Sequence, residues 1–377
     1  METTQTTITK IKEVTLLNLF DYATSELSQD AFISWLLMWG NEKYRNVDAA
    51  LHSIACKLIN EMICEQEDVE EQIEVREVKI KQQEAHIDVL AIVKDTNDIQ
   101  YAIIIEDKTD TSEHSNQLRN YTTYVSDKYK NHIIKCVYYK SGNECKSKIQ
   151  KMTNNYNTGS NKLKIITRAD FLEILCAEVC NNLILQNYIA YLQEIERLTN
   201  LYKEREVAQW GSRAWEGFCM DMENKLDYKS KWQHSPYKKE DKNGKYDVIE
   251  FTLTIPIKES EAKLYLQIYC CRKKIEYTHL FFRIKGSASI STIPETWRTA
   301  IKKFNEDNKE NNLKASTIHK GKQITNAIQF AHISGEDFFG KGIVKVDKIA
   351  DRLVQWHEKL QALAKELSAT EVTQSNK

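Results

Sequence analysis

Three charged side chains, Asp88, Glu106 and Lys108, lie within two runs that otherwise have the composition of buried β-strands. The runs, residues 84–93 and 101–108, are rich in β-branched residues on both faces, which is typical of strands covered above and below. A carboxylate isolated in such surroundings costs several kcal/mol or takes up a proton. Two carboxylates that face one divalent cation satisfy each other through the metal, so a metal site is the simplest explanation.

The period of two along a β-strand decides which of these side chains share a face. Glu106 and Lys108 point to one face while Asp107 points to the other, and His86 and Asp88 share a face of the preceding strand. The segment between the two strands is polar and turn-prone, so we expect an antiparallel hairpin that places Asp88 opposite the end carrying Glu106 and Lys108. His86 could join the site, although a single histidine is more often a structural hydrogen-bonding residue.

These residues, in this order, resemble the motif of the PD-(D/E)XK nuclease superfamily. Asp88 is followed eighteen residues later by Glu106-Asp-Lys108. The next segment, Gln117-Leu-Arg-Asn-Tyr121, is similar to the RecB-like Gln-x-x-x-Tyr on the helix after the core hairpin. A lone Glu-x-Lys is common in charged chains, so the resemblance depends on the combination.

The segment at residues 25–40 also resembles the opening helix of bacterial members of this superfamily, where an acidic residue near the helix start faces the metal. By that resemblance Glu26 takes this role, with Asp30 as the second choice. Ile87 stands where the family motif has proline, a position that varies widely among members. The resemblance covers roughly residues 20–170 and says nothing about the rest of the chain.

The resemblance implies phosphodiester hydrolysis at a hard cation, with Mg²⁺ as the default ion and Mn²⁺ as a substitute. The expected metal ligands all supply oxygen atoms, from the carboxylates of Glu26, Asp88 and Glu106 and the carbonyl of Asp107. Lys108 would orient or help to deprotonate the attacking water and offset charge that grows on the phosphorane. Gln117 and Tyr121 would position the water or the scissile phosphate.

Each of these residues also has an explanation without catalysis. Asp88 could face solvent, and the charges that end the second strand could simply emerge into a loop. Gln117 and Tyr121 lie four residues apart on a helix and could form only a side-chain pair worth a few tenths of a kcal/mol. An acid at the start of a helix, such as Glu26, meets the macrodipole favourably without any metal.

The chain has 377 residues, which is enough for two domains. We expect a PD-(D/E)XK nuclease-like domain at residues 1–205, an α+β recognition or regulatory domain at 206–368, and a disordered tail at 369–377. No apolar run approaches the ~20 residues of a membrane span, and the first residues lack a secretory signal, so we expect a cytoplasmic protein. The nine cysteines are scattered without Cys-x-x-Cys spacing, which favours reduced thiols.

Charge is unevenly distributed although the formal net charge is only −1. Residues 61–77 are mostly acidic, whereas residues 128–168 are mostly basic. A basic surface beside the site would hold a phosphate backbone, with a solvated lysine-rich surface as the alternative. Residues 228–239 interleave basic and aromatic side chains as base-stacking surfaces do, although amphipathic loops with tyrosine and tryptophan are common. The side chains that we expect to contact nucleic acid are Lys128, Lys130, Lys135, Lys140, Lys146, Lys148 and Trp232.

The hydrophobic pattern predicts the elements that must position these residues. In the first domain we expect helices at 26–39, 47–64, 113–129 and from 169 to about 205, and strands at 72–80, 85–93, 100–107, 132–139 and 163–167. In the second we expect helices at 207–226, 293–308 and 344–368 and strands at 246–257, 262–271 and 276–285. The predicted fold class is α/β, with a restriction-endonuclease-like mixed β-sheet core flanked by helices and a C-terminal α+β domain.

The sequence therefore predicts a divalent-metal-dependent nuclease. We expect DNA rather than RNA as the substrate, a preference that comes from the resemblance alone, and a role in bacterial antiviral defence is a hypothesis of the same kind. The resemblance also allows a homodimer, because many such nucleases cut both strands as dimers. Two alternatives stay open at this point: an RNA or tRNA nuclease, and a catalytically silent module that binds nucleic acid or protein on the nuclease fold.

Overall fold

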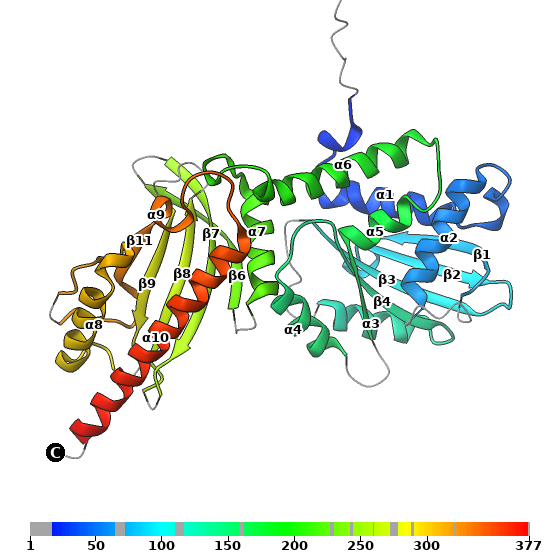
Figure 1. The fold of residues 1–377 in the computed structure, drawn as a ribbon. Coiled ribbons are helices and arrows are strands. Elements are labelled where there is room, and N and C mark those ends of the chain that lie inside the picture. Colours follow the sequence, from blue (N-terminus) through cyan, green and yellow to red (C-terminus); the bar gives the residue numbers. More distant parts are fainter. Residues whose placement is uncertain are drawn as a thin grey trace, which may run out of the picture. The chain divides into compact units, whose positions relative to one another are not determined.

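The computed structural model describes residues 17–375 apart from 65–71, 110–116, 158–161, 227–229, 242–243, 259, 272–277, 288–289 and 320. The chain forms two compact units (Figure 1). Unit 1 consists of Met1–Ser141 and Asn161–Glu194, and unit 2 consists of Gly142–Ser160 and Ile195–Lys377. The two units therefore interleave along the chain, whereas the sequence suggested a single division between residues 205 and 206.

Unit 1 is built on a five-stranded mixed sheet in the order β1-β2-β3-β4-β5. Its strands are β1 (Val75–Gln82), β2 (Val89–Asp95), β3 (Gln100–Lys108), β4 (Ile133–Lys140) and β5 (Leu163–Thr167). The first three strands pair antiparallel, and β4 and β5 run parallel to β3. Most residues of β2 and β3 are buried, as their β-branched residues on both faces predicted.

A polar turn joins β2 to β3 and fixes the hairpin. The carboxylate Oδ1 of Asp95 accepts hydrogen bonds from the backbone N–H groups of Asn97 and Ile99, at 2.9 and 2.8 Å. Side-chain acceptors of this kind stabilise tight turns because they satisfy backbone donors that the sheet leaves unpaired. The resulting register places the C-terminal end of β3 beside Asp88, the residue that directly precedes β2.

Helices cover both faces of this sheet (Figure 1). One face is covered by α1 (Glu26–Met38), α2 (Ala49–Ile63), α5 (Arg168–Leu175) and the first part of α6 (Leu183–Asn200). Their apolar side chains share a core with the odd-numbered residues of β2 and β3. Helix α3 (Gln117–Lys128) packs on β3 and β4, and its buried Leu118 and Val125 lie outside that core. The even-numbered Glu106 and Lys108 therefore point to the face of α3.

Unit 2 is built on a six-stranded antiparallel sheet in the order β10-β11-β9-β8-β7-β6. Its strands are β6 (Ser230–Asp241), β7 (Gly244–Pro256), β8 (Lys263–Cys271), β9 (His279–Lys285), β10 (Lys314–Ala315) and β11 (Ile328–Ser334). Its helices are α4 (Lys146–Tyr156), α7 (Ser212–Lys225), α8 (Glu295–Asp307), α9 (Gly335–Phe339) and α10 (Val346–Ser375). Aromatic side chains form much of its core; the ring centroids of Phe282 and Trp356 lie 4.9 Å apart.

The fold class agrees with the prediction: a mixed sheet flanked by helices forms a restriction-endonuclease-like α/β core, and the second unit is α+β. Some elements differ. Helix α4 and strands β6 and β11 occupy segments for which the sequence predicted no helix or strand, and α10 extends to Ser375, through most of the tail expected to be disordered. Residues 113–116 and 276–277, expected in α3 and β9, lie outside the described residues. Over the described chain, every helix is too short or too polar to cross a bilayer.

Candidate active site

The end of the β2–β3 hairpin brings the three predicted charges together. Lys108 Nζ lies 3.2 Å from Asp88 Oδ2 and 2.7 Å from Glu106 Oε1. The backbone carbonyl of Asp107 accepts a hydrogen bond from the same ammonium at 2.9 Å. Asp88 Oδ2 also accepts a hydrogen bond from the backbone N–H of Asp107 at 3.1 Å, which holds the carboxylate in place. Three oxygen atoms, two of them from carboxylates, therefore surround one cationic nitrogen.

Burial strengthens these ionic contacts. Glu106 is 0% exposed and Lys108 is 7% exposed, so water screens their charges weakly. Burial by itself lowers the pKa of Lys108, but the hydrogen bond and the charge of Glu106, together with the charge of Asp88, outweigh burial and raise that pKa. Lys108 is therefore an ammonium at neutral pH.

The oxygen atoms around Lys108 fit the requirements of a hard divalent cation. Asp88 Oδ2, Glu106 Oε1 and the carbonyl of Asp107 all reach one cationic atom, and Mg²⁺ prefers oxygen ligands and keeps several waters. Among the residues that the structure describes, no group of three or more His, Cys, Asp or Glu side chains is placed to hold a metal. A divalent cation bound beside the Lys108 ammonium would therefore need the main-chain carbonyl and water in addition to the two carboxylates.

Helix α3 brings Gln117 and Tyr121 to the same cluster. Gln117 Nε2 donates a hydrogen bond to the Tyr121 hydroxyl at 2.9 Å, and that hydroxyl donates to the carbonyl of His86 at 2.7 Å. Burial raises the pKa of Tyr121; the hydrogen bond from Gln117 opposes this, and the negative charges of Glu106 and Asp88 add to it. Tyr121 thus lies within electrostatic reach of both carboxylates and ties α3 to the segment that precedes β2.

The prediction that His86 shares a strand face with Asp88 is wrong. His86 ends a short 3-10 turn, Glu84–His86, and the strand begins only at Val89. Its φ of 67° and the φ of 53° at Ala85 turn the chain, and the imidazole is exposed. His86 therefore contributes its main-chain carbonyl to the cluster, as the acceptor for Tyr121.

Glu26 lies at the edge of the cluster. Its Oε1 accepts a hydrogen bond from the backbone N–H of Thr109 at 3.1 Å, so the start of α1 is fixed to the end of β3. Its negative charge contributes to the raised pKa of Lys108. Glu26 and Asp30, the first and second choices for the acid of α1 that faces the metal, lie in different environments. Glu26 faces the end of β3, whereas Asp30 is buried one turn further along the helix.

A second polar layer, which the sequence did not reveal, lies beneath the cluster. The side chain of Asp107 points away from Lys108 and accepts a hydrogen bond from Gln29 Nε2. Burial raises the pKa of Asp30 to about 7 and raises that of Asp107 well above its usual range. The charge of Asp30 adds to the raised pKa of Asp107, the charge of Asp88 adds to that of both, and a hydrogen bond between the two carboxyls lowers the pKa of Asp30. We therefore expect the two carboxyls to share a proton at neutral pH.

Two tyrosines extend this layer into the core of unit 1. The Tyr188 hydroxyl donates to Gln29 Oε1 at 2.9 Å, and the hydroxyls of Tyr139 and Tyr188 are 3.1 Å apart. Buried polar groups in contact rigidify a core when they are satisfied, so this chain holds Asp107 and hence the end of β3. The sequence places Gln29 and Asp30 directly before the apolar part of this helix, and they are the first buried residues of α1, whose later buried residues are apolar apart from Ser34.

The structure distributes the predicted nucleic-acid-binding residues over several environments. Lys128, paired with Glu84 at 3.0 Å, and Lys130 are exposed in unit 1, and Lys135 is half-buried there. Lys140 is only 2% exposed, so its placement on a basic surface is wrong; it ends an apolar strand. The remaining predicted residues belong to unit 2: Lys146 and Lys148 are exposed on α4, and Trp232 lies in β6, opposite Phe251 of β7.

Comparisons with known proteins agree with this geometry. The family model described as PD-(D/E)XK nuclease superfamily matches residues 17–206, half of the chain and nearly all of the sheet, helices and charged cluster described above. Searches of curated proteins and of solved structures returned no match. Membership of this superfamily indicates a metal-dependent nuclease acting on nucleic acid. On the evidence of the motif, the fold and the family model, the chain belongs to the PD-(D/E)XK nuclease superfamily.

Proposed function

We propose that the protein is a Mg²⁺- or Mn²⁺-dependent endonuclease that hydrolyses phosphodiester bonds in DNA. The observation that supports this most strongly is the position of Lys108 Nζ, 3.2 Å from Asp88 Oδ2, 2.7 Å from Glu106 Oε1 and 2.9 Å from the Asp107 carbonyl. Buried charges are costly unless they are paired or used, and a cation-binding site gives these charges a use.

In this proposal each residue has a definite task. Asp88, Glu106 and the carbonyl of Asp107 hold the cation, and Glu26 lies close enough to add a further ligand through water. A divalent cation, when bound, polarises the phosphoryl group and lowers the pKa of water. Lys108, as an ammonium, orients the attacking water, stabilises the hydroxide that forms from it and offsets the negative charge that grows on the phosphorane.

Gln117 and Tyr121 complete the site as a RecB-like Gln-x-x-x-Tyr pair. Their hydrogen bond fixes both side chains, and the Tyr121 hydroxyl anchors the turn before Asp88 through the His86 carbonyl. They are proposed to position the water or the scissile phosphate. Exposed Lys128 and Lys130 at the end of α3 lie on the same unit and suit phosphate contacts.

The proposal also includes four less direct elements: DNA as the substrate, a cytoplasmic location, a role in bacterial antiviral defence and a homodimer. They are supported by the resemblance to stand-alone bacterial nucleases, not by individual side chains. A substrate assay decides the first of them directly, because the same cluster could cut DNA or RNA.

The test is a cleavage assay on plasmid, linear and single-stranded DNA and on RNA, with Mg²⁺, Mn²⁺ or EDTA. Asp88→Ala and Lys108→Ala should each lower the cleavage rate by roughly 100-fold or more, since each removes a charge that acts on the reacting phosphate. Lys94→Ala serves as the matched control, because Lys94 lies on the same hairpin and pairs with Asp98 at its far end. If the protein cut RNA alone, RNA would replace DNA as the proposed substrate. If the original protein and all variants bound nucleic acid without cutting it, the result would favour a catalytically silent binding module.

A further inference from the structure

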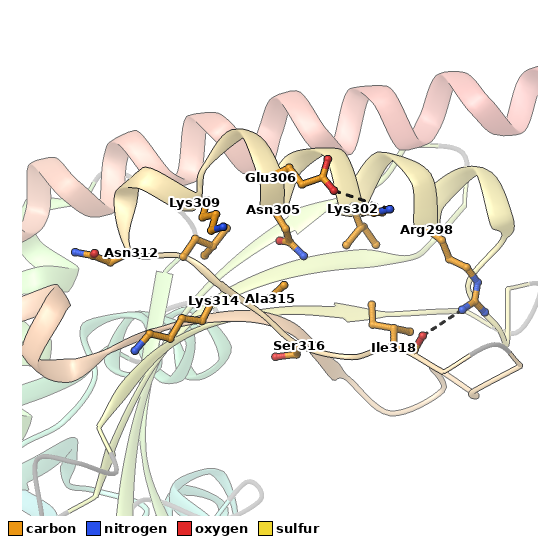
Figure 2. A pocket seen from close by; sticks show the side chains of 12 residues that line it. Arg298, Lys302, Asn305, Glu306, Lys309, Asn312, Lys314, Ala315, Ser316 and Ile318 are labelled. Carbon is orange, nitrogen blue, oxygen red and sulfur yellow. Dashed lines mark hydrogen bonds and ion pairs between the residues drawn. The ribbon is translucent and has the colours of Figure 1, made fainter.

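Unit 2 contains a pocket of about 720 Å³ between α8 and the segment 312–318, which contains β10 (Figure 2). It is separate from the charged cluster of unit 1 and does not depend on the proposed nuclease activity. Its volume falls within the roughly 300–1,000 Å³ of small-molecule sites. Apolar side chains, Ile301 from α8 and Leu313 and Ile318 from the facing segment, line much of its wall.

The charged side chains at this pocket are mostly basic. Arg298, Lys302, Lys309 and Lys314 line it together with a single acid, Glu306. Figure 2 shows Arg298 and Lys302 toward one end and Lys309 and Lys314 toward the other.

The two ends differ in how far their charges are already neutralised. Arg298 pairs with Glu295 at 3.5 Å, and Lys302 lies 3.9 Å from Glu306. At the opposite end Lys314 pairs with Asp337 at 3.8 Å, much as Lys302 does with Glu306, but within the described residues Lys309 makes no ion pair. The Lys309–Lys314 end therefore has one more cation than its ion-pairing acids and favours an anionic group.

Polar atoms in the pocket wall favour a ligand that carries hydrogen-bonding groups as well as apolar surface. Asn305 Nδ2 donates to the carbonyl of Phe330 at 3.3 Å, which fixes the orientation of its amide. Its Oδ1 is enclosed by protein atoms and receives no hydrogen bond within the described part of the chain. Figure 2 shows Asn305 projecting from α8 toward Ala315 of the facing segment. A ligand with N–H or hydroxyl donors reaches this oxygen once the amide turns toward the pocket, and it then satisfies a group that a purely hydrocarbon ligand leaves without a partner.

We propose that this pocket binds a nucleotide, with the base against Ile301 and Ile318, a donor of the base or sugar toward Asn305, and the phosphate between Lys309 and Lys314. The combination of an apolar wall, a few neutral polar groups and one cationic end matches a heteroaromatic ring that carries a phosphate. Unit 2 would then be a ligand-binding unit joined to a nuclease unit.

The test is isothermal titration calorimetry of the full-length protein with AMP, GMP, CMP and UMP, and with laurate as an acyl anion of similar size. EDTA keeps divalent metal, and therefore metal-held phosphate, out of unit 1. We expect one nucleotide per chain to bind, and we expect Lys309→Glu combined with Lys314→Glu to weaken binding by roughly tenfold or more, since it removes two charge pairs and adds repulsion.

Two further variants make the result specific. Ala315→Phe fills the pocket without changing its charge and should also weaken binding. Lys303→Glu makes the same type of substitution at one exposed position of α8 outside the pocket and should leave binding unchanged. Binding of laurate but of no nucleotide, nucleotide binding that survives both pocket variants, or absence of binding by all five compounds would each overturn the proposal.

Discussion

Replacing Asp30 with asparagine tests the carboxyl pair that lies beneath the proposed site. Burial, followed by the charge of Asp88, raises the pKa of Asp30 from 3.8 to about 7. An acid with a raised pKa holds its proton in the folded protein at pH values where the unfolded chain has released it. Stability is therefore greatest below the unfolded pKa and is lost as the pH rises from about 4 to about 7.

The size of the effect follows from the same two values. Between pH 5 and pH 8 the unfolded carboxyl is already ionised, while the folded one gives up its proton only near pH 7. Roughly two pH units separate pH 5 from that point, and each is worth ~1.4 kcal/mol, so the loss for this group is about 2–3 kcal/mol at most. Asparagine cannot ionise, so Asp30→Asn should remove this part of the pH dependence.

The assay is urea unfolding at pH 5 and pH 8 in EDTA, followed by hydrogen exchange of peptides from β2 and β3. These peptides report on unit 1 without a contribution from unit 2. The quantity to compare is the change in unfolding free energy between the two pH values, in the original protein and in the variant.

Asp127→Asn is the matched control, because Asp127 is exposed on α3 and the same charge is removed there. The control should keep the pH dependence of the original protein. If Asp30→Asn also kept it, so that the two stability profiles ran parallel, the pair would not hold its proton as described and the reasoning from burial would be refuted.

Three other changes have defined outcomes. Gln29→Leu removes the amide that donates a hydrogen bond to the buried Asp107 carboxyl. The unfolding free energy of unit 1 should therefore fall by about 1–3 kcal/mol in urea denaturation. Tyr121→Phe loses one hydroxyl but keeps the ring; cleavage should slow while the melting temperature changes little, and an unchanged rate would remove Tyr121 from the site. Lys130→Ala should reduce the salt dependence of DNA binding by about one ion, whereas buried Lys140→Ala should lower stability and leave that slope unchanged.

The central hairpin could be predicted because its information is local. The alternation in β3 places Glu106 and Lys108 on one face, and the polar turn fixes which residue lies opposite them. The start of β2 could not be predicted in the same way. Positive φ values at Gln83, Ala85 and His86 turn the chain there, and none of these residues is a glycine or an asparagine that would have indicated it.

Longer-range features were out of reach for a different reason. Asp107 meets Gln29 across 78 positions of sequence, and Lys140 is buried because of the strands and helices around it. Helix α4 is rich in lysine and asparagine and has only three apolar residues, Ile149, Met152 and Tyr156, so its helical spacing is easily missed in a polar segment. Strand β6 contains Pro236, which is uncommon inside strands. In each of these cases the structure depends on packing between residues distant in sequence, which local patterns do not reveal.

The interleaving of the units has a consequence for how the protein can be divided. Parallel neighbours such as β4 and β5 require a crossover connection, and here its helix, α4, belongs to the other unit. Its first turn is held there by Glu223 of α7, whose carboxylate accepts from the backbone N–H groups of Lys146 and Ser147 at 2.9 and 3.2 Å. A fragment that stopped at residue 205 would release α4 from that anchor. Truncation there should therefore give a less stable fragment, because the crossover between β4 and β5 would lose its support.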